Sequence, residues 1–223
     1  MMKELLENDF PQYYGVGKRP TAVEKNTSEL EFDLVDAPMD FLRPVSTGFV
    51  SFINDGKNLS VINYEGFLNK FGDTKISKGK HRCDFIMTDT ISSSLCLLCE
   101  ITSTKGGVSN LSKPIVKETG KEKVKILVFP GGKYEKAEQQ LLGTLRNIMP
   151  VPTIKSFVDA KSRKVCLMGY KIFPGNSTQN AFNRGKQMEA EEAGENGAMI
   201  PSPEIEAYGF QYFRISNKYK FKL

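Results

Sequence analysis

The fold is decided by two short apolar runs, RCDFIM at residues 82–87 and LCLLCEIT at residues 95–102. The stretch between them, DTISSS at 89–94, is polar and typical of a turn, so the runs are expected to form neighbouring antiparallel strands. The second run is almost wholly apolar before Glu100, as in a central strand that is buried on both faces. Strands of this length bring Asp84, near the start of the first run, to the same end of the pair as Glu100.

Outward from this pair, the sequence predicts an α+β (α/β) protein with a central mixed β-sheet flanked by helices. The clearest helix is Tyr134–Met149, whose apolar residues recur at helical spacing between the run PGG at 130–132 and Pro150. The residues NDG at 54–56 tolerate left-handed backbone and predict a hairpin. Strands are expected at Val45–Ile53, Leu59–Tyr64, Cys83–Thr88, Leu95–Thr102, Val124–Phe129 and Lys164–Phe173. The stretch Lys113–Lys125 is expected to be an exposed loop or insertion.

The length of 223 residues suits one large domain with four parts. Residues 1–44 are expected to be an irregular N-terminal segment that packs on the core, with a short helix near Lys3–Asn8. Residues 45–175 form the predicted α/β core, and 176–200 read as a polar mobile loop. Residues 201–223 are expected to add C-terminal strands to the same domain, with a turn at 216–218.

Composition favours a cytoplasmic protein with a true core and no membrane segment. Hydrophobic residues make up 39% of the chain, yet no stretch approaches the roughly 18 apolar residues that span a bilayer, and no signal peptide begins it. Cys96 and Cys99 have the spacing of metal ligands, but the strand period points their sulfurs to opposite faces and no second pair completes a zinc site. The net charge of +5 is compatible with a polyanionic partner without requiring one.

Two carboxylates at one end of a strand pair are suited to holding a hard divalent cation. Mg²⁺ prefers carboxylate oxygens and water as ligands, and Mn²⁺ can take its place. Such a metal activates water and neutralises a phosphodiester under attack. We therefore interpret Asp84 and Glu100 as candidate metal ligands and candidate catalytic residues. The alternative is that the two acids mark strand ends that meet solvent.

With these residues the chain resembles the PD-(D/E)XK nucleases. In that family an aspartate lies on one strand and an E-x-K triplet on the next, within a restriction-endonuclease-like core of mixed sheet and helices. The resemblance covers roughly residues 59–173 and rests on a short motif. It implies a metal-dependent nuclease, a phosphodiester hydrolase acting on DNA, in which Asp84 and Glu100 hold Mg²⁺ or Mn²⁺.

The sequence departs from the family motif at its lysine. Thr102 stands at that position and carries no positive charge. Lys105, three residues later, is a candidate replacement from a loop. Glu65 is a candidate for the additional upstream acid of many members, and either Gln139 or Gln140 for the helix glutamine of some.

Basic residues near the C-terminus are candidates for nucleic-acid binding. Interleaved with aromatic residues, they could contact a phosphate backbone while the rings stack on bases. A terminal strand pair with aromatic residues inward and lysines outward predicts the same alternation, so both interpretations stay open. The basic residues are Arg214, Lys218, Lys220 and Lys222, and the aromatic ones are Tyr212, Phe213, Tyr219 and Phe221.

Two functions follow from the sequence. The first is a Mg²⁺- or Mn²⁺-dependent nuclease acting on DNA or RNA. The second is a protein that keeps the nuclease-like fold, has lost the chemistry at Thr102, and serves as a scaffold that binds nucleic acid or another protein. The acid pair favours the first function and Thr102 favours the second.

Overall fold

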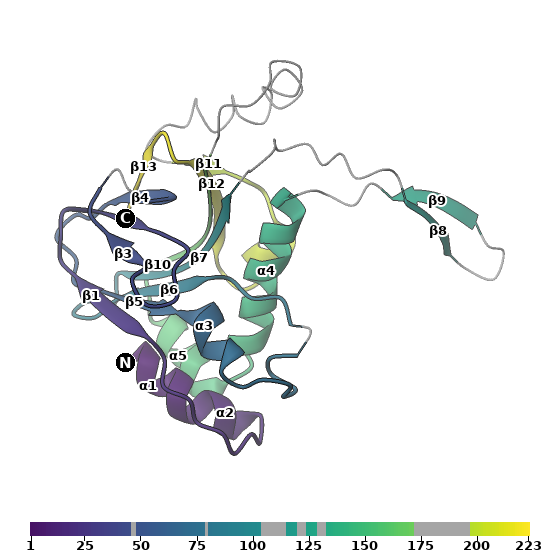
Figure 1. Ribbon diagram of the computed structural model, residues 1–223, viewed down its shortest axis with the longest axis horizontal. Helices are drawn as coiled ribbons and strands as arrows, with labels where there is room; N and C mark the ends of the chain where they lie inside the picture. The colour runs from purple at the N-terminus through teal and green to yellow at the C-terminus, as the bar shows by residue number, and fades with distance from the viewer. Residues whose placement is uncertain (46–47, 79, 104–114, 120–123, 129–132, 172–196) are drawn as a thin grey trace.

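The computed structural model describes residues 1–45, 48–78, 80–103, 115–119, 124–128, 133–171 and 197–223. A mixed seven-stranded sheet forms its centre, in the order β1-β5-β6-β7-β10-β12-β11 (Figure 1). The neighbouring strands β1, β5, β6 and β7 pair antiparallel. The strands β7, β10 and β12 are parallel to one another, and β11 is antiparallel to β12. The strands are β1 Glu24–Thr27, β5 Leu59–Asn63, β6 Phe85–Asp89, β7 Leu95–Ser103, β10 Arg163–Lys171, β11 Ala198–Met199 and β12 Gln211–Ser216. The predicted α+β class with a central mixed sheet is confirmed.

A smaller four-stranded sheet packs on one face of the large one. Its order is β13-β4-β2-β3, from β2 Glu31–Leu34, β3 Leu42–Arg43, β4 Val50–Ile53 and β13 Lys220–Lys222. Phe32 and Phe52 of the small sheet share one buried cluster with Leu97 and Leu167 of the large sheet. Between the sheets, Val50 lies directly against Gly169 of β10, where a Cβ would meet a Val50 methyl group at 1.7 Å. The absence of a side chain at Gly169 therefore sets the spacing of the sheets.

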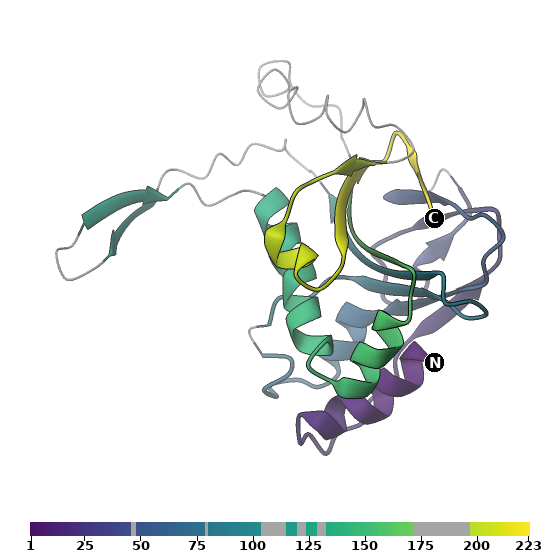
Figure 2. The same ribbon diagram turned by 180° about the vertical axis from the view of Figure 1, so that it is seen from behind.

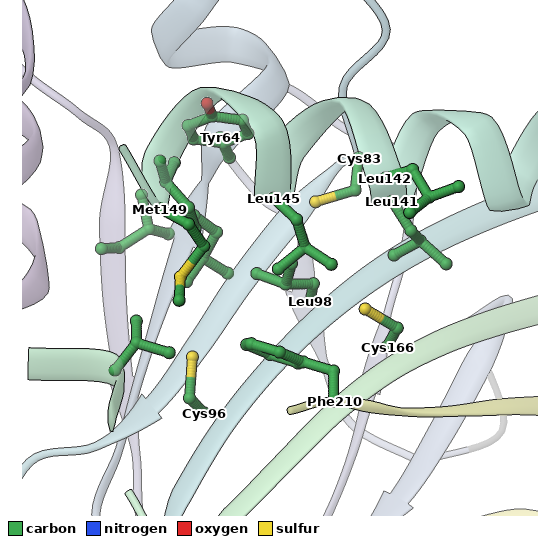
Figure 3. Packing of buried hydrophobic residues seen from close by; sticks show 14 of the residues in the cluster. Tyr64, Cys83, Cys96, Leu98, Leu141, Leu142, Leu145, Met149, Cys166 and Phe210 are labelled. Carbon is green, nitrogen blue, oxygen red and sulfur yellow. The ribbon is translucent and has the colours of Figure 1, made fainter. Parts of the chain in front are cut away.

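Helices cover the opposite face of the large sheet (Figure 2). Alternate residues of the central strands, such as Cys96, Leu98 and Cys166, point into this second cluster, where they meet Leu141 and Leu145 of α4 (Figure 3). The helical elements are α1 Met2–Glu4, η1 Leu5–Asp9, α2 Phe10–Tyr13, α3 Tyr64–Asn69, α4 Lys133–Ile148, α5 Pro152–Asp159 and α7 Pro203–Glu206.

The predicted strand pair and helix are confirmed. Strand β7 is buried on both faces, because Leu98 belongs to the helix-side cluster while Leu97 and Cys99 belong to the inter-sheet cluster. Cys96 and Cys99 accordingly lie on opposite faces of the sheet, as the strand period predicts. Helix α4 begins one residue earlier and ends one residue earlier than predicted.

Three predicted pairings and conformations are wrong. β4 and β5 flank a turn at which Gly56 has a φ of 72°, but they belong to different sheets and form no hairpin. β12 and β13 likewise belong to different sheets. Residues 1–44 are not irregular: they form a helical segment and the strands β1, β2 and β3, although Met2, Leu6 and Phe10 do pack on the core as expected.

Residues 115–128 form a separate hairpin. β8 Ile115–Thr119 pairs with β9 Val124–Val128, and this two-stranded sheet projects away from the large one (Figure 1). The prediction of a loop over 113–125 is therefore wrong for β8, while the alternative of an insertion fits a hairpin that belongs to neither of the other sheets. The predicted strand at 124–129 exists without being a central strand. Of the loop predicted at 176–200, only 197–200 lie among the described residues.

No helix in the described part of the chain is long and apolar enough to cross a membrane.

Candidate functional site

Asp84 and Glu100 lie side by side where β6 begins. Phe85 of β6 pairs with Cys99 of β7, so one further step of the same register sets Asp84 opposite Glu100. The Asp84 side chain is fixed by the backbone amide of Ile101, which donates to its Oδ2 at 2.6 Å. Its carbonyl oxygen accepts from the amide of Tyr64 at 2.8 Å, which ties it to the start of α3. The predicted meeting of the two carboxylates at one end of the strand pair is present.

The two carboxylates line an open pocket of about 320 Å³. Its walls come from parts of the chain far apart in sequence: the ends of β6 and β7, the connection from β2 to β3, and the first turns of α4. The pocket is predominantly polar, unlike the two core clusters on either side of the sheet. Its lining residues are Asp36, Asp84, Glu100, Ile101, Thr102, Lys136 and Gln140.

Glu100 is the most unusual group in this pocket. Only 5% of the residue is exposed, and its Oε2 has no hydrogen-bond partner among the described residues. Burial raises the pKa of the Glu100 carboxyl well above its ordinary value, and the neighbouring charge of Asp84 raises it further. Burial also raises the pKa of Asp84, against the lowering effect of the Ile101 hydrogen bond. A buried carboxyl without a partner is unfavourable unless a cation or a proton compensates it.

Lys136 brings a positive charge to the pocket, and the sequence reasoning missed it. It is exposed, lies in the first turn of α4 and lowers the pKa of both Asp84 and Glu100. A signal was available, because Lys136 precedes Gln140 by four residues and so shares its face of the helix. The predicted replacement for the family lysine, Lys105, lies outside the described residues.

Gln140, rather than Gln139, is the helix glutamine of this pocket. Its Nε2 donates to the carbonyl of Arg82 at 3.1 Å, just before Asp84 in the chain. One turn later, Thr144 accepts through Oγ1 from the amide of Cys83 at 2.8 Å. Two successive turns of α4 thus hold the segment that enters β6.

The upstream acid of the pocket is Asp36 and not Glu65. Asp36 belongs to the connection between β2 and β3, which the sequence reasoning treated as irregular. Glu65 begins α3 and lies 3.9 Å from the guanidinium of Arg82. Its charge raises the pKa of Asp84, so it is near, although it does not line the pocket. Thr102 does line the pocket and is half-buried, and it brings no positive charge there.

The donor set fits a cation held partly by water. In the described part of the chain, no three side chains from His, Cys, Asp or Glu converge on one metal position. Two adjacent carboxylates that leave the remaining positions to water and to a substrate oxygen suit Mg²⁺, which usually keeps several of its waters.

The C-terminal basic residues are not gathered into one surface. Arg214 is half-buried on β12, Lys220 of β13 forms an ion pair with Glu31 at 2.6 Å, and Lys222 is exposed on the small sheet. Lys218 is exposed in the turn between β12 and β13. Among the aromatic residues, Tyr212 and Phe221 lie in the core and Phe213 and Tyr219 pack partly against it. The inward-aromatic interpretation holds for Tyr212 and Phe221, although β12 and β13 do not pair.

Comparison of the chain with protein-family models, with curated proteins and with solved structures finds no match.

Proposed function

We propose that this protein is a divalent-metal-dependent phosphodiesterase of the PD-(D/E)XK type, a hydrolase acting on nucleic acid. The observation that carries the proposal is the buried, unpartnered Glu100 oxygen beside Asp84 in an open pocket. The likeness to PD-(D/E)XK nucleases rests on the short motif and on the order of the elements around it.

The energetics favour a function over a structural role for the acid pair. Two adjacent buried carboxyls repel one another once ionised, and neither forms an ion pair in the described part of the chain. A cation between them removes this repulsion and satisfies the open oxygen of Glu100. An apolar pair at the same positions would stabilise the fold more, so the acids are best explained by a ligand.

Asp84, Glu100 and Lys136 have distinct roles in the proposed reaction. Asp84 and Glu100 would hold the metal, with Asp84 oriented by the amide of Ile101. When bound, Mg²⁺ or Mn²⁺ lowers the pKa of a coordinated water and neutralises charge on the phosphodiester. Lys136, on the opposite wall, would attract the phosphate and stabilise the negative charge that develops on it. Lys136 thereby supplies from α4 the charge that Thr102 lacks.

A second candidate function, an inactive nuclease-like scaffold that binds nucleic acid or a protein, is favoured by Thr102. Lys136 is exposed on a helix, and its long side chain is less fixed than a lysine on β7 would be. The two functions share the fold and differ in whether the pocket binds metal and turns over substrate.

Calorimetric titration of Mn²⁺ and Mg²⁺ tests the metal site. We expect the wild type to bind, and Asp84→Asn and Glu100→Gln to lose at least about tenfold in affinity, the range seen when metal-site contacts are removed. Asp73→Asn serves as the control, since Asp73 is exposed and outside the pocket. Wild-type protein that binds no metal, alone or with an uncleavable oligonucleotide, would overturn the proposal.

Cleavage of single- and double-stranded DNA and RNA then separates the two functions. We expect metal-dependent cleavage that Lys136→Ala reduces by about 10²-fold, as for removal of one charge-stabilising donor, with partial recovery in Lys136→Arg. Metal binding without cleavage of any of these substrates would favour the scaffold.

A further inference from the structure

Arg214 is held in an unusual way on the same sheet face as the acid pair. Its guanidinium lies over the ring of Tyr134, 4.8 Å from the centroid, and beside the ring of Tyr212 at 5.1 Å. Its Nε donates to the hydroxyl of Tyr212 at 3.1 Å. Tyr134 begins α4 and Tyr212 is buried in β12, so a helix and a strand both fix this side chain.

The strand register places Arg214 level with Glu100. Met168 of β10 pairs with Glu100 on one side and with Arg214 on the other. Residues in one such row point to the same face of the sheet, so Arg214 and Glu100 both face the helix side. Two strand spacings separate them, which is about 10 Å. Asp84, Glu100, Met168 and Arg214 thus form one row across the neighbouring strands β6, β7, β10 and β12, of which the last three are parallel.

The charge of Arg214 has no carboxylate partner in the described part of the chain. By contrast, three other arginines do form ion pairs with carboxylates: Arg43, Arg82 and Arg146. Arg214 is half-buried and lies against two rings. The Nη edge of a guanidinium is suited to planar, two-point hydrogen bonds. The ligand that such an edge matches is an oxyanion, a carboxylate or a phosphate.

We propose that Arg214 binds a backbone phosphate that flanks the scissile one, so that the substrate is a nucleic-acid strand and not a mononucleotide or an isolated phosphodiester. This inference rests on the proposed function of the Asp84–Glu100 pocket. Arg214 is not among the residues that line the pocket, and its backbone lies about 10 Å from that of Glu100, so its position suits a phosphate beside the scissile one. A second phosphate along the same strand meets Arg214, and its binding aligns the strand with the pocket.

The structural alternative is that Arg214 only joins α4 to β12. Both roles predict lower stability when the side chain is removed, but they differ in which substrates suffer. A structural role disturbs α4 and with it Lys136 and Gln140, so all substrates lose turnover. A flanking-phosphate role leaves substrates without a second phosphate unaffected.

The experiment compares an oligonucleotide with bis(p-nitrophenyl) phosphate, which has one phosphodiester and no neighbour. The variant is Arg214→Gln, which keeps a planar side chain against the two rings and removes the charge, with Arg214→Lys as the charge-keeping variant. Arg19→Gln is the matched control, because Arg19 is an exposed arginine that does not line the pocket. Thermal melting confirms that each variant is folded.

We expect Arg214→Gln to raise KM for the oligonucleotide about tenfold, to leave kcat for bis(p-nitrophenyl) phosphate unchanged, and to be partly rescued in Arg214→Lys. Equal losses on both substrates, or no loss on either, would overturn the inference.

If the wild type cleaves neither substrate, the proposed hydrolysis is wrong. The role of Arg214 in phosphate binding is then tested by measuring oligonucleotide affinity. Fluorescence anisotropy of a labelled oligonucleotide would then show weaker binding by Arg214→Gln, and a slope of log Kd against log salt reduced by about one relative to wild type and Arg19→Gln. Equal affinities and slopes would overturn the inference.

Discussion

At the scale of single residues, this protein buries carboxylates in two contrasting ways. Asp89, at the end of β6, is almost fully satisfied: its Oδ1 accepts from the amides of Ile91 and Ser92, and its Oδ2 from the hydroxyls of Ser92 and Ser94. Glu100 has an oxygen that nothing in the described chain satisfies. The first arrangement closes a turn, and the second is open to a ligand. The number of hydrogen-bond partners thus distinguishes Asp89, a structural acid, from Glu100, a candidate functional one.

Replacement of Asp89 should reveal its contribution through pH. Burial raises the pKa of Asp89, but the hydrogen bonds from Ser92, Ser94 and the two amides outweigh it and bring the pKa to about 2. Because the folded pKa lies below the ordinary value of 3.8, the carboxylate stabilises the fold above about pH 4, and this stabilisation is lost as pH falls towards 2. We expect Asp89→Asn to lower the free energy of unfolding by about 1–3 kcal/mol at neutral pH.

Urea unfolding of wild type and Asp89→Asn across that pH range measures this effect. The difference between the two proteins should shrink as pH falls from about 4 to about 2. Asp73→Asn, at an exposed position, should differ little from wild type at any pH. A difference that stays constant with pH would show that the Asp89 charge is not what stabilises the turn.

The sequence could identify some residues of the site and not others, for a physical reason. Asp84 and Glu100 are visible because strand periodicity and a short turn fix their relation over 16 residues. Asp36 and Lys136 reach the pocket only through the packing of the small sheet and of α4. No local pattern encodes the placement of Asp36. The spacing of Lys136 from Gln140 indicates a shared helix face, but not that this face meets the acid pair.

At the scale of elements, α4 is the part that was best predicted and that most closely controls the site. Its apolar stripe fixed its existence and bounds to within one residue, because an amphipathic helix needs only local periodicity. Strand partners were harder: NDG at 54–56 specifies a turn, but a turn does not determine whether the strands on either side pair. β4 and β5 leave that turn for different sheets.

Gly143 in α4 offers a test of how tightly the helix is seated. A Cβ there would lie 2.3 Å from the carbonyl oxygen of His81, two residues before Cys83. Gly→Ala within a helix ordinarily stabilises it by about 1 kcal/mol. We expect the opposite sign for Gly143→Ala, a loss of about 1–2 kcal/mol, because the helix must move away from the backbone.

Thermal and urea unfolding check the sign, and metal titration checks whether the displaced helix disturbs the pocket. Gly17→Ala is the control, since a Cβ at Gly17 would meet nothing within 4 Å. Stabilisation by Gly143→Ala would show that α4 is seated less closely against the chain at His81.

At the scale of the whole molecule, the two sheets make up a fold that local patterns describe only in part. The sequence predicts the large sheet through its apolar runs. The small sheet depends on β13 joining β4, a contact between residues more than 160 positions apart. Loop closure over such a distance leaves no periodic signal, so the second layer could only be seen in three dimensions.

The coupling between the sheets can be measured at Gly169 and Val50. Gly169→Ala should destabilise the protein by about 1–3 kcal/mol, because its new methyl group would overlap Val50. Val50→Ala should also destabilise, by leaving a cavity.

A double-mutant cycle in urea gives the interaction energy. We expect Gly169→Ala with Val50→Ala to cost less than the sum of the two single changes, by at least about 0.5 kcal/mol. Strict additivity would mean that the two residues are not in direct contact in solution.

The burial of the four cysteines determines how fast their thiols can react. All four are free and buried, on or next to three adjacent central strands, and burial raises the pKa of each thiol. Cys83, Cys96 and Cys166 lie on the helix side of the sheet (Figure 3). A thiol that is both inaccessible and protonated does not react. Alkylation must therefore wait until the sheet itself opens. When alkylation is faster than reclosing, the rate at which thiols disappear is the rate of that opening. The native thiols thus report on unfolding of the central sheet without an engineered label.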